Sequence, residues 1–70
     1  MRLSARNQLK GKILSITHGA INSEVVIEIG PGISITAQVT TSSIHSLRLK
    51  EGDTAYAVIK ADSVMVGADD

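Results

Sequence analysis

The chain has 70 residues, with seven basic and seven acidic side chains, a formal net charge of zero and no cysteine. A domain of this size buries only about 60% of its unfolded surface, and without cysteines it gains no stability from disulfides or cysteine-bound zinc. Oligomerisation is therefore the expected source of extra stability. Tyr56 is the only aromatic residue, which argues against nucleic acid as a partner, because single-strand-binding barrels stack bases on several rings and carry positive charge.

The chain contains no targeting or membrane signal. No apolar run reaches the ~18 residues of a membrane span. The segment from Met1 to Lys10 is polar and lacks the apolar stretch of a signal peptide. We expect a cytoplasmic protein without membrane contact.

Three strands are predicted in the first forty residues. Ile33 to Thr40 alternates apolar and polar residues, which is typical of a half-buried strand. Glu24 to Ile29 predicts a strand that is apolar on both faces, and Gly30 to Gly32 predicts the hairpin turn between these two strands. Gly11 to Thr17 predicts an earlier strand, joined to the second by His18 to Asn22.

The remaining residues predict one short helix and two more strands. Hydroxyl side chains accept hydrogen bonds from free backbone N–H groups, so the threonines and serines before Ile44 favour a helix start, and we expect a helix from Ser42 to Leu47. Lys50 to Asp53 predicts a turn. Thr54 to Lys60 and Ser63 to Val66 are the expected fourth and fifth strands, and the last four residues form a polar tail.

This order predicts an all-β, five-stranded Greek-key barrel of the OB type with one short helix. An SH3-like barrel is the alternative. The whole chain, residues 1–70, is expected to be one domain with its core at about residues 3–66. Because Glu24 to Ile29 and Thr54 to Lys60 are apolar on both faces, one face is expected to meet the core and the other a second subunit.

The sequence offers little for catalysis. His18 and His45 lie far apart in the sequence, there is no cysteine nucleophile, and no glycine-rich phosphate loop is present. Glu24 and Glu28 are expected to face solvent on a strand. We do not expect an enzyme, a metal ligated directly by side chains or an organic cofactor.

The N-terminal run Ser4-Ala5-Arg6-Asn7-Gln8 is a candidate anion-binding segment. In an extended segment Ser4 and Arg6 point to the same side, where a hydroxyl donor and a guanidinium fork can meet one anion. The alternative is a solvated arm without a ligand.

A second set of hydrogen-bond donors lies at the helix start, from Thr40 to Ser43. Hydroxyls at this position cap the helix, and together with free N–H groups and the helix dipole they can also hold an anion. Lys60 ends an apolar strand, where a lysine ordinarily extends to water. It can instead supply positive charge to an anion that neutral donors surround.

The N-terminal motif also carries a resemblance to a known family. Ser4 to Gly11 resembles the start of the molbindins, also called Mop or molybdenum-pterin-binding proteins, and equally the Mop domains of the molybdate-responsive transcription regulator. The similarity runs from about Leu3 to Val66. The later segments that carry it are Glu24-Val25-Val26, the alternating strand that ends at Val39-Thr40, Lys50-Glu51-Gly52 and Val58-Ile59-Lys60-Ala61.

The resemblance implies an OB-like barrel in a homo-oligomer, a hexamer built as a trimer of dimers, that binds molybdate or tungstate at subunit interfaces. It implies a site made of Ser4, the Ala5 backbone, Arg6, Thr40, Ser43 and Lys60. It also implies a second site near a three-fold axis, for which the turn His18-Gly19-Ala20 is the candidate.

Molybdate suits such donors, because it is a tetrahedral dianion that hydroxyl and N–H groups can surround while arginine or lysine balances its charge. With Tyr56 as the only ring, a pterin ligand is not favoured. The sequence carries no DNA-binding or transporter ATPase domain, which within this family predicts storage of the anion. A protein-interaction module without ligand and a nucleic-acid-binding OB domain are the alternatives, and nothing in the sequence separates molybdate from tungstate or sets the affinity.

Overall fold

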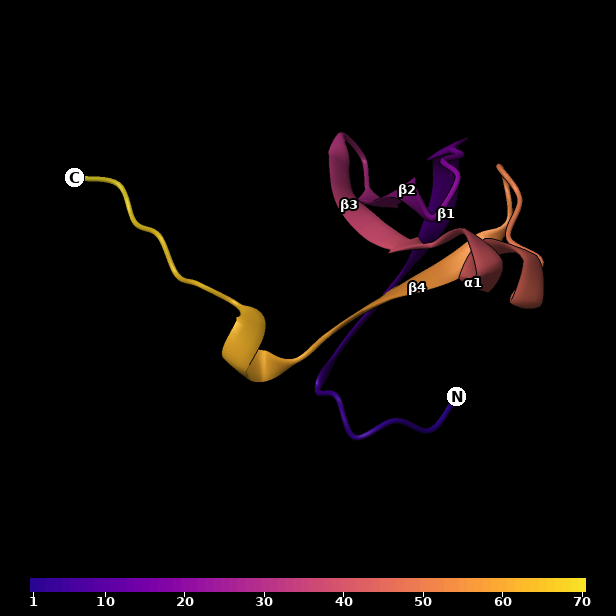
Figure 1. Cartoon of the computed structure of the whole chain (residues 1–70). Coiled ribbons are helices and arrows are strands. Elements are labelled where there is room, and N and C mark those ends of the chain that lie inside the picture. The colour runs from indigo at the N-terminus through magenta and orange to yellow at the C-terminus, as the bar shows by residue number, and fades with distance from the viewer.

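The computed structural model describes every residue from Met1 to Asp70 and has one curled antiparallel sheet with a short helix (Figure 1). The hydrogen-bonded strand order is β3-β2-β1-β4. In chain order the elements are β1 (Asn7–Thr17), β2 (Asn22–Gly30), β3 (Ile33–Thr40), α1 (Thr41–Ser46), β4 (Thr54–Ile59) and the 3₁₀ turn η1 (Ala61–Ser63).

Strand β1 is the centre of the sheet and is longer than the sequence indicates. It begins at Asn7, four residues before the expected Gly11. The residues Asn7 to Lys10 show no period-two pattern, but they pair with β4, from Asn7 opposite Ile59 to Lys10 opposite Tyr56. Pairing supplies the backbone hydrogen bonds that make this polar stretch a strand.

The hairpin of β2 and β3 agrees with its prediction. Val25 and Ile27 are buried on β2, and the polar residues between the apolar positions of β3 are exposed. Gly30 pairs with Ile33, so Pro31 and Gly32 alone form the turn. Gly32 has φ 73°, which the third position of a type II turn requires.

Helix α1 is anchored at both ends by hydrogen bonds. Thr40 is the N-cap, and its Oγ1 accepts from the Ser43 N–H at 3.2 Å. At the other end the N–H groups of Arg48 and Leu49 donate to the carbonyls of His45 and Ile44, a Schellman motif with Arg48 at φ 53°. The helix spans Thr41–Ser46, so it begins and ends one residue earlier than the expected Ser42 to Leu47.

The expected fifth strand is not formed, so the prediction of five strands is wrong for the single chain. Ala61 to Ser63 forms η1, and no residue after it belongs to a strand. A strand requires a neighbouring strand for its backbone hydrogen bonds, and Ser63 to Val66 has none within this chain.

The core is small. It consists of Ile13, Val25, Ile27, Ile44 and Ala57, contributed by all elements except β3 and η1. The accessible surface is 5605 Å², whereas a compact chain of 7.3 kDa is expected to expose about 4,200 Å². This chain therefore exposes far more surface than its mass requires.

Neither helical segment is long and apolar enough to cross a bilayer.

Candidate functional site

Four of the predicted anion ligands lie together at the start of β1. The N-terminal arm runs beside the end of β4, because Asn7 pairs with Ile59. A surface pocket forms at this junction, lined by Ser4, Ala5, Arg6, Lys60, Ala61 and Asp62. Segments more than fifty residues apart in the sequence therefore place one hydroxyl, one guanidinium and one ammonium group around the same cavity.

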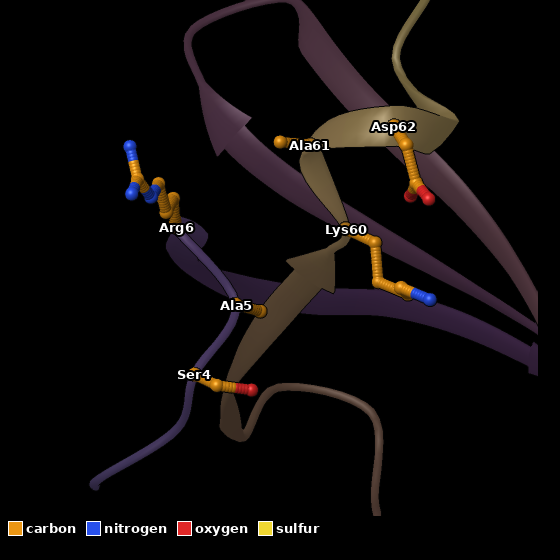
Figure 2. Close-up of a pocket in the computed structure, with 6 residues that line it drawn as sticks. All are labelled: Ser4, Ala5, Arg6, Lys60, Ala61 and Asp62. Carbon is orange, nitrogen blue, oxygen red and sulfur yellow. The ribbon is translucent and has the colours of Figure 1, made fainter.

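The side chains in this pocket do not all point the same way (Figure 2). Ser4 and Lys60 extend to one side of the arm, whereas Arg6 extends to the other. The prediction that Ser4 and Arg6 point to one side holds only for an extended segment, and the chain bends at both residues. The bend is held by Gln8, whose Nε2 donates to the Ala5 carbonyl at 2.8 Å.

The Ala5 backbone N–H and the three polar side chains keep their donors free. The Ala5 N–H makes no hydrogen bond within the chain, and Ser4, Arg6 and Lys60 are exposed. Free donors of this kind are what an oxyanion requires.

Two further residues line the pocket that were not predicted from the sequence, Ala61 and Asp62. Asp62 is one of the residues of η1, and Figure 2 shows its carboxylate beside the Lys60 side chain. A carboxylate repels an oxyanion, so Asp62 lowers the positive potential that Lys60 creates. The only signal in the sequence for its location in the pocket is its position two residues after Lys60.

The other two predicted ligands, Thr40 and Ser43, form the N-terminal end of α1. Their hydroxyl oxygens lie 2.7 Å apart, and Thr40 Oγ1 also lies 3.3 Å from Ser42 Oγ. The capping role expected for these hydroxyls is confirmed, with Thr40 as the cap. Both residues lie outside the pocket that holds Ser4 and Lys60.

The two groups of ligands lie at opposite ends of β1. Arg6 precedes the first residue of β1, whereas Thr40 pairs with Asn22, just after the last residues of β1 pair with β2. An 11-residue strand spans up to about 33 Å. The predicted ligands of one chain therefore form two separated groups, named the arm half-site (Ser4, Ala5, Arg6 and Lys60) and the helix half-site (Thr40 and Ser43).

The second candidate site, His18-Gly19-Ala20, is an exposed turn between β1 and β2. Its backbone is held by a ring of hydrogen bonds. The Gly19 N–H donates to Ser23 Oγ at 3.2 Å, Thr41 Oγ1 donates to the Gly19 carbonyl at 2.7 Å, and the two hydroxyls lie 2.8 Å apart. Since Ser23 is buried, this ring fixes the turn against the start of α1.

The comparisons with known proteins agree on one family. The sequence matches the TOBE domain over residues 3–66. It is 49% identical over 69 residues to a probable molybdenum-pterin-binding protein of Haemophilus influenzae, covering 99% of this chain and all of that protein.

Two solved structures share the fold. MopII from Clostridium pasteurianum superposes with a TM-score of 0.89 at 43% identity, covering 96% of this chain and all of MopII. The cytoplasmic molybdate-binding protein ModG, in a form with molybdate bound, gives a TM-score of 0.82 at 48% identity over 87% of this chain and 43% of ModG.

A curled antiparallel sheet of this order with one short helix is the OB-like architecture of the Mop structures, and the relatives define a class of oxyanion-binding domains. The chain belongs to the TOBE-domain proteins and, within them, to the molbindins, the molybdenum-pterin-binding proteins.

Proposed function

We propose that this protein binds molybdate, and tungstate as its close analogue, at sites shared between copies of the chain, and that it stores the anion in the cytoplasm. The observation that carries the proposal is the arm half-site, where Ser4, Arg6 and Lys60 line one pocket with free donors. Support comes from the relatives, because ModG is described as a cytoplasmic protein and is seen with molybdate bound. The role is one of binding rather than catalysis.

The donor chemistry suits a tetrahedral dianion. The Ser4 hydroxyl and the Ala5 N–H supply directed hydrogen bonds, and the Lys60 ammonium supplies charge. Arg6 points away in Figure 2, but its side chain is exposed, so it can rotate toward a bound anion at little cost. Burial between two subunits would strengthen each of these bonds, because the local dielectric falls.

Sharing between copies follows from the separation of the half-sites. Within one chain the arm half-site and the helix half-site lie at opposite ends of β1, so one anion can contact both only if they come from different copies. The large exposed surface of the single chain favours such an assembly, and we propose a hexamer built as a trimer of dimers. The Haemophilus influenzae relative, a probable molybdenum-pterin-binding protein, supports the binding role.

Molybdate is expected to raise the melting temperature. A ligand that binds only the folded state stabilises it by about 2.7 kcal/mol at one hundred times its dissociation constant, which for a small domain corresponds to a shift on the order of 10–20 °C. Melting curves in molybdate, tungstate, sulfate and chloride at equal ionic strength test this. Equal curves in molybdate and chloride at millimolar concentration would contradict the proposed function and would favour a ligand-free interaction module.

Shared sites predict complementation between two defective variants. The first variant combines Arg6→Ala and Lys60→Ala, which removes positive charge from the arm half-site. Thr40→Asp keeps a capping side chain on α1 but repels an anion, and Thr40→Asn is its neutral control. When the two variants are co-expressed and assemble at random, about a quarter of the sites combine two intact halves, since each half comes from a different copy. Equilibrium dialysis measures the bound molybdate, and a mixture that binds no more than either variant alone would show that the site is not shared.

A further inference from the structure

The pocket of the arm half-site contains one charged group that cannot donate a hydrogen bond. Ser4, Arg6 and Lys60 are donors, whereas the ionised carboxylate of Asp62 only accepts. Arg6 extends to the other side of the arm, so Lys60 and Asp62 are the two charges on the side of Ser4 (Figure 2). Their charges cancel, and this side of the pocket therefore offers donors and one acceptor rather than a purely cationic surface.

The turn η1 fixes the position of this carboxylate. The Ser63 N–H donates to the Lys60 carbonyl at 2.9 Å, and the Val64 N–H donates to the Ala61 carbonyl at 3.3 Å. Asp62 is the middle residue of this turn, so its backbone is held next to Lys60. Its side chain is exposed and takes no part in the side-chain hydrogen bonds of the chain. The carboxylate is therefore free to accept a hydrogen bond from a ligand in the pocket.

We propose that Asp62 is a specificity-determining residue of the arm half-site and that it distinguishes tetrahedral oxyanions by whether they carry a proton. Phosphate keeps at least one proton at neutral pH, so its O–H donates to the Asp62 carboxylate while Ser4 and Lys60 donate to its other oxygens. Molybdate and sulfate are fully ionised at this pH. They have no hydrogen to donate, and they meet Asp62 as a like charge.

This inference rests on the proposed function for the location of the anion and goes beyond it in naming a residue that opposes the anion. A site discriminates against a ligand when it sets an unpaired or like-charged group against it. Asp62 therefore makes molybdate bind more weakly than Ser4, Arg6 and Lys60 alone would allow. Such a moderate affinity agrees with the proposed storage role, because a stored anion must also be released.

Asp62→Asn removes the charge and keeps the shape of the side chain and its suitability for the first turn of η1. An exposed charge pair changes an equilibrium constant by up to about fivefold, and these anions carry two charges, so we expect molybdate and sulfate to bind about tenfold more tightly. Phosphate is expected to change by less than about threefold, because the lost charge-assisted hydrogen bond offsets the lost repulsion.

Asp53→Asn is the matched control. Asp53 is an exposed residue just before β4, at the opposite end of that strand from Lys60, and it lies outside the pocket. The two variants change the net charge of the chain equally. A gain in sulfate and molybdate affinity that is as large in Asp53→Asn as in Asp62→Asn would reflect the charge of the whole chain and would overturn the inference.

Equilibrium dialysis at neutral pH and constant ionic strength measures radiolabelled phosphate, radiolabelled sulfate and molybdate separately. We expect the parent protein to bind phosphate about tenfold more tightly than sulfate, and Asp62→Asn to bind the two with nearly equal affinity. A parent that does not prefer phosphate, or a preference that Asp62→Asn retains, overturns the inference.

Direct binding of phosphate and sulfate separates this inference from the proposed function. A parent protein that prefers phosphate to sulfate through Asp62 but does not bind molybdate would contradict the proposed function alone. A parent that binds molybdate, with affinities for all three anions that Asp62→Asn leaves unchanged, would contradict the inference alone. A parent that binds none of the three anions contradicts both.

Discussion

The Arg6→Ala, Lys60→Ala double variant is expected to bind molybdate at least about a hundredfold more weakly than the parent protein. Each side chain supplies a charged donor to the arm half-site, and a hydrogen bond to a charged group contributes about 1.5–3 kcal/mol. Each single variant is expected to lose about tenfold or more. Equilibrium dialysis with elemental analysis measures the affinities.

Lys12→Ala is the matched control for this experiment. Lys12 is an exposed basic residue on β1, outside the pocket of Ser4 and Lys60, so its removal changes the net charge by the same step as either single variant without removing a proposed ligand. Light scattering must show that every variant still assembles. A double variant that assembles and retains the affinity of the parent would mean that Arg6 and Lys60 do not hold the anion.

Gly11→Ala is expected to destabilise the fold by overpacking between β1 and β2. A Cβ at Gly11 would lie 2.3 Å from the Glu28 carbonyl oxygen and 2.8 Å from Ile27 Cγ2, and the carbonyl is backbone that cannot move without separating β1 from β2. Overpacking of this kind costs about 1–3 kcal/mol or more. For a domain of this size 1 kcal/mol corresponds to about 4–8 °C in melting temperature.

Gly67→Ala is the control, because a Cβ at Gly67 has open space around it. Thermal unfolding followed by circular dichroism at one protein concentration compares the two variants. A Gly11→Ala protein that melts at the parent temperature would show that the close approach of β1 and β2 at this point is absent in solution.

The pattern of side chains along the sequence was sufficient for the elements that obey a local period. The alternation from Ile33 to Thr40 defined β3 fully, and the glycine and proline of Gly30 to Gly32 defined its turn, because period and turn chemistry act over a few residues. The hydroxyls before Ile44 located α1 to within one residue. The run from Ser4 to Gln8 carried the family resemblance, which the relatives confirm.

Tertiary structure decided the features that depend on a distant partner. Asn7 to Lys10 forms a strand because β4 lies beside it. Ser63 to Val66 does not form a strand, because no strand of the same chain lies beside it. Neighbouring residues do not encode such pairing, since the backbone hydrogen bonds of a strand are made to another segment.

The candidate site divides in the same way. Composition and motif selected its residue types, Ser4, Arg6, Thr40, Ser43 and Lys60, but not their grouping. Folding brings Lys60 to the N-terminal arm, turns Arg6 to the opposite side and leaves Thr40 at the far end of β1. The grouping follows from the length of β1 and the bend of the arm, which are set by packing and pairing over the whole chain rather than by the spacing of residues along it.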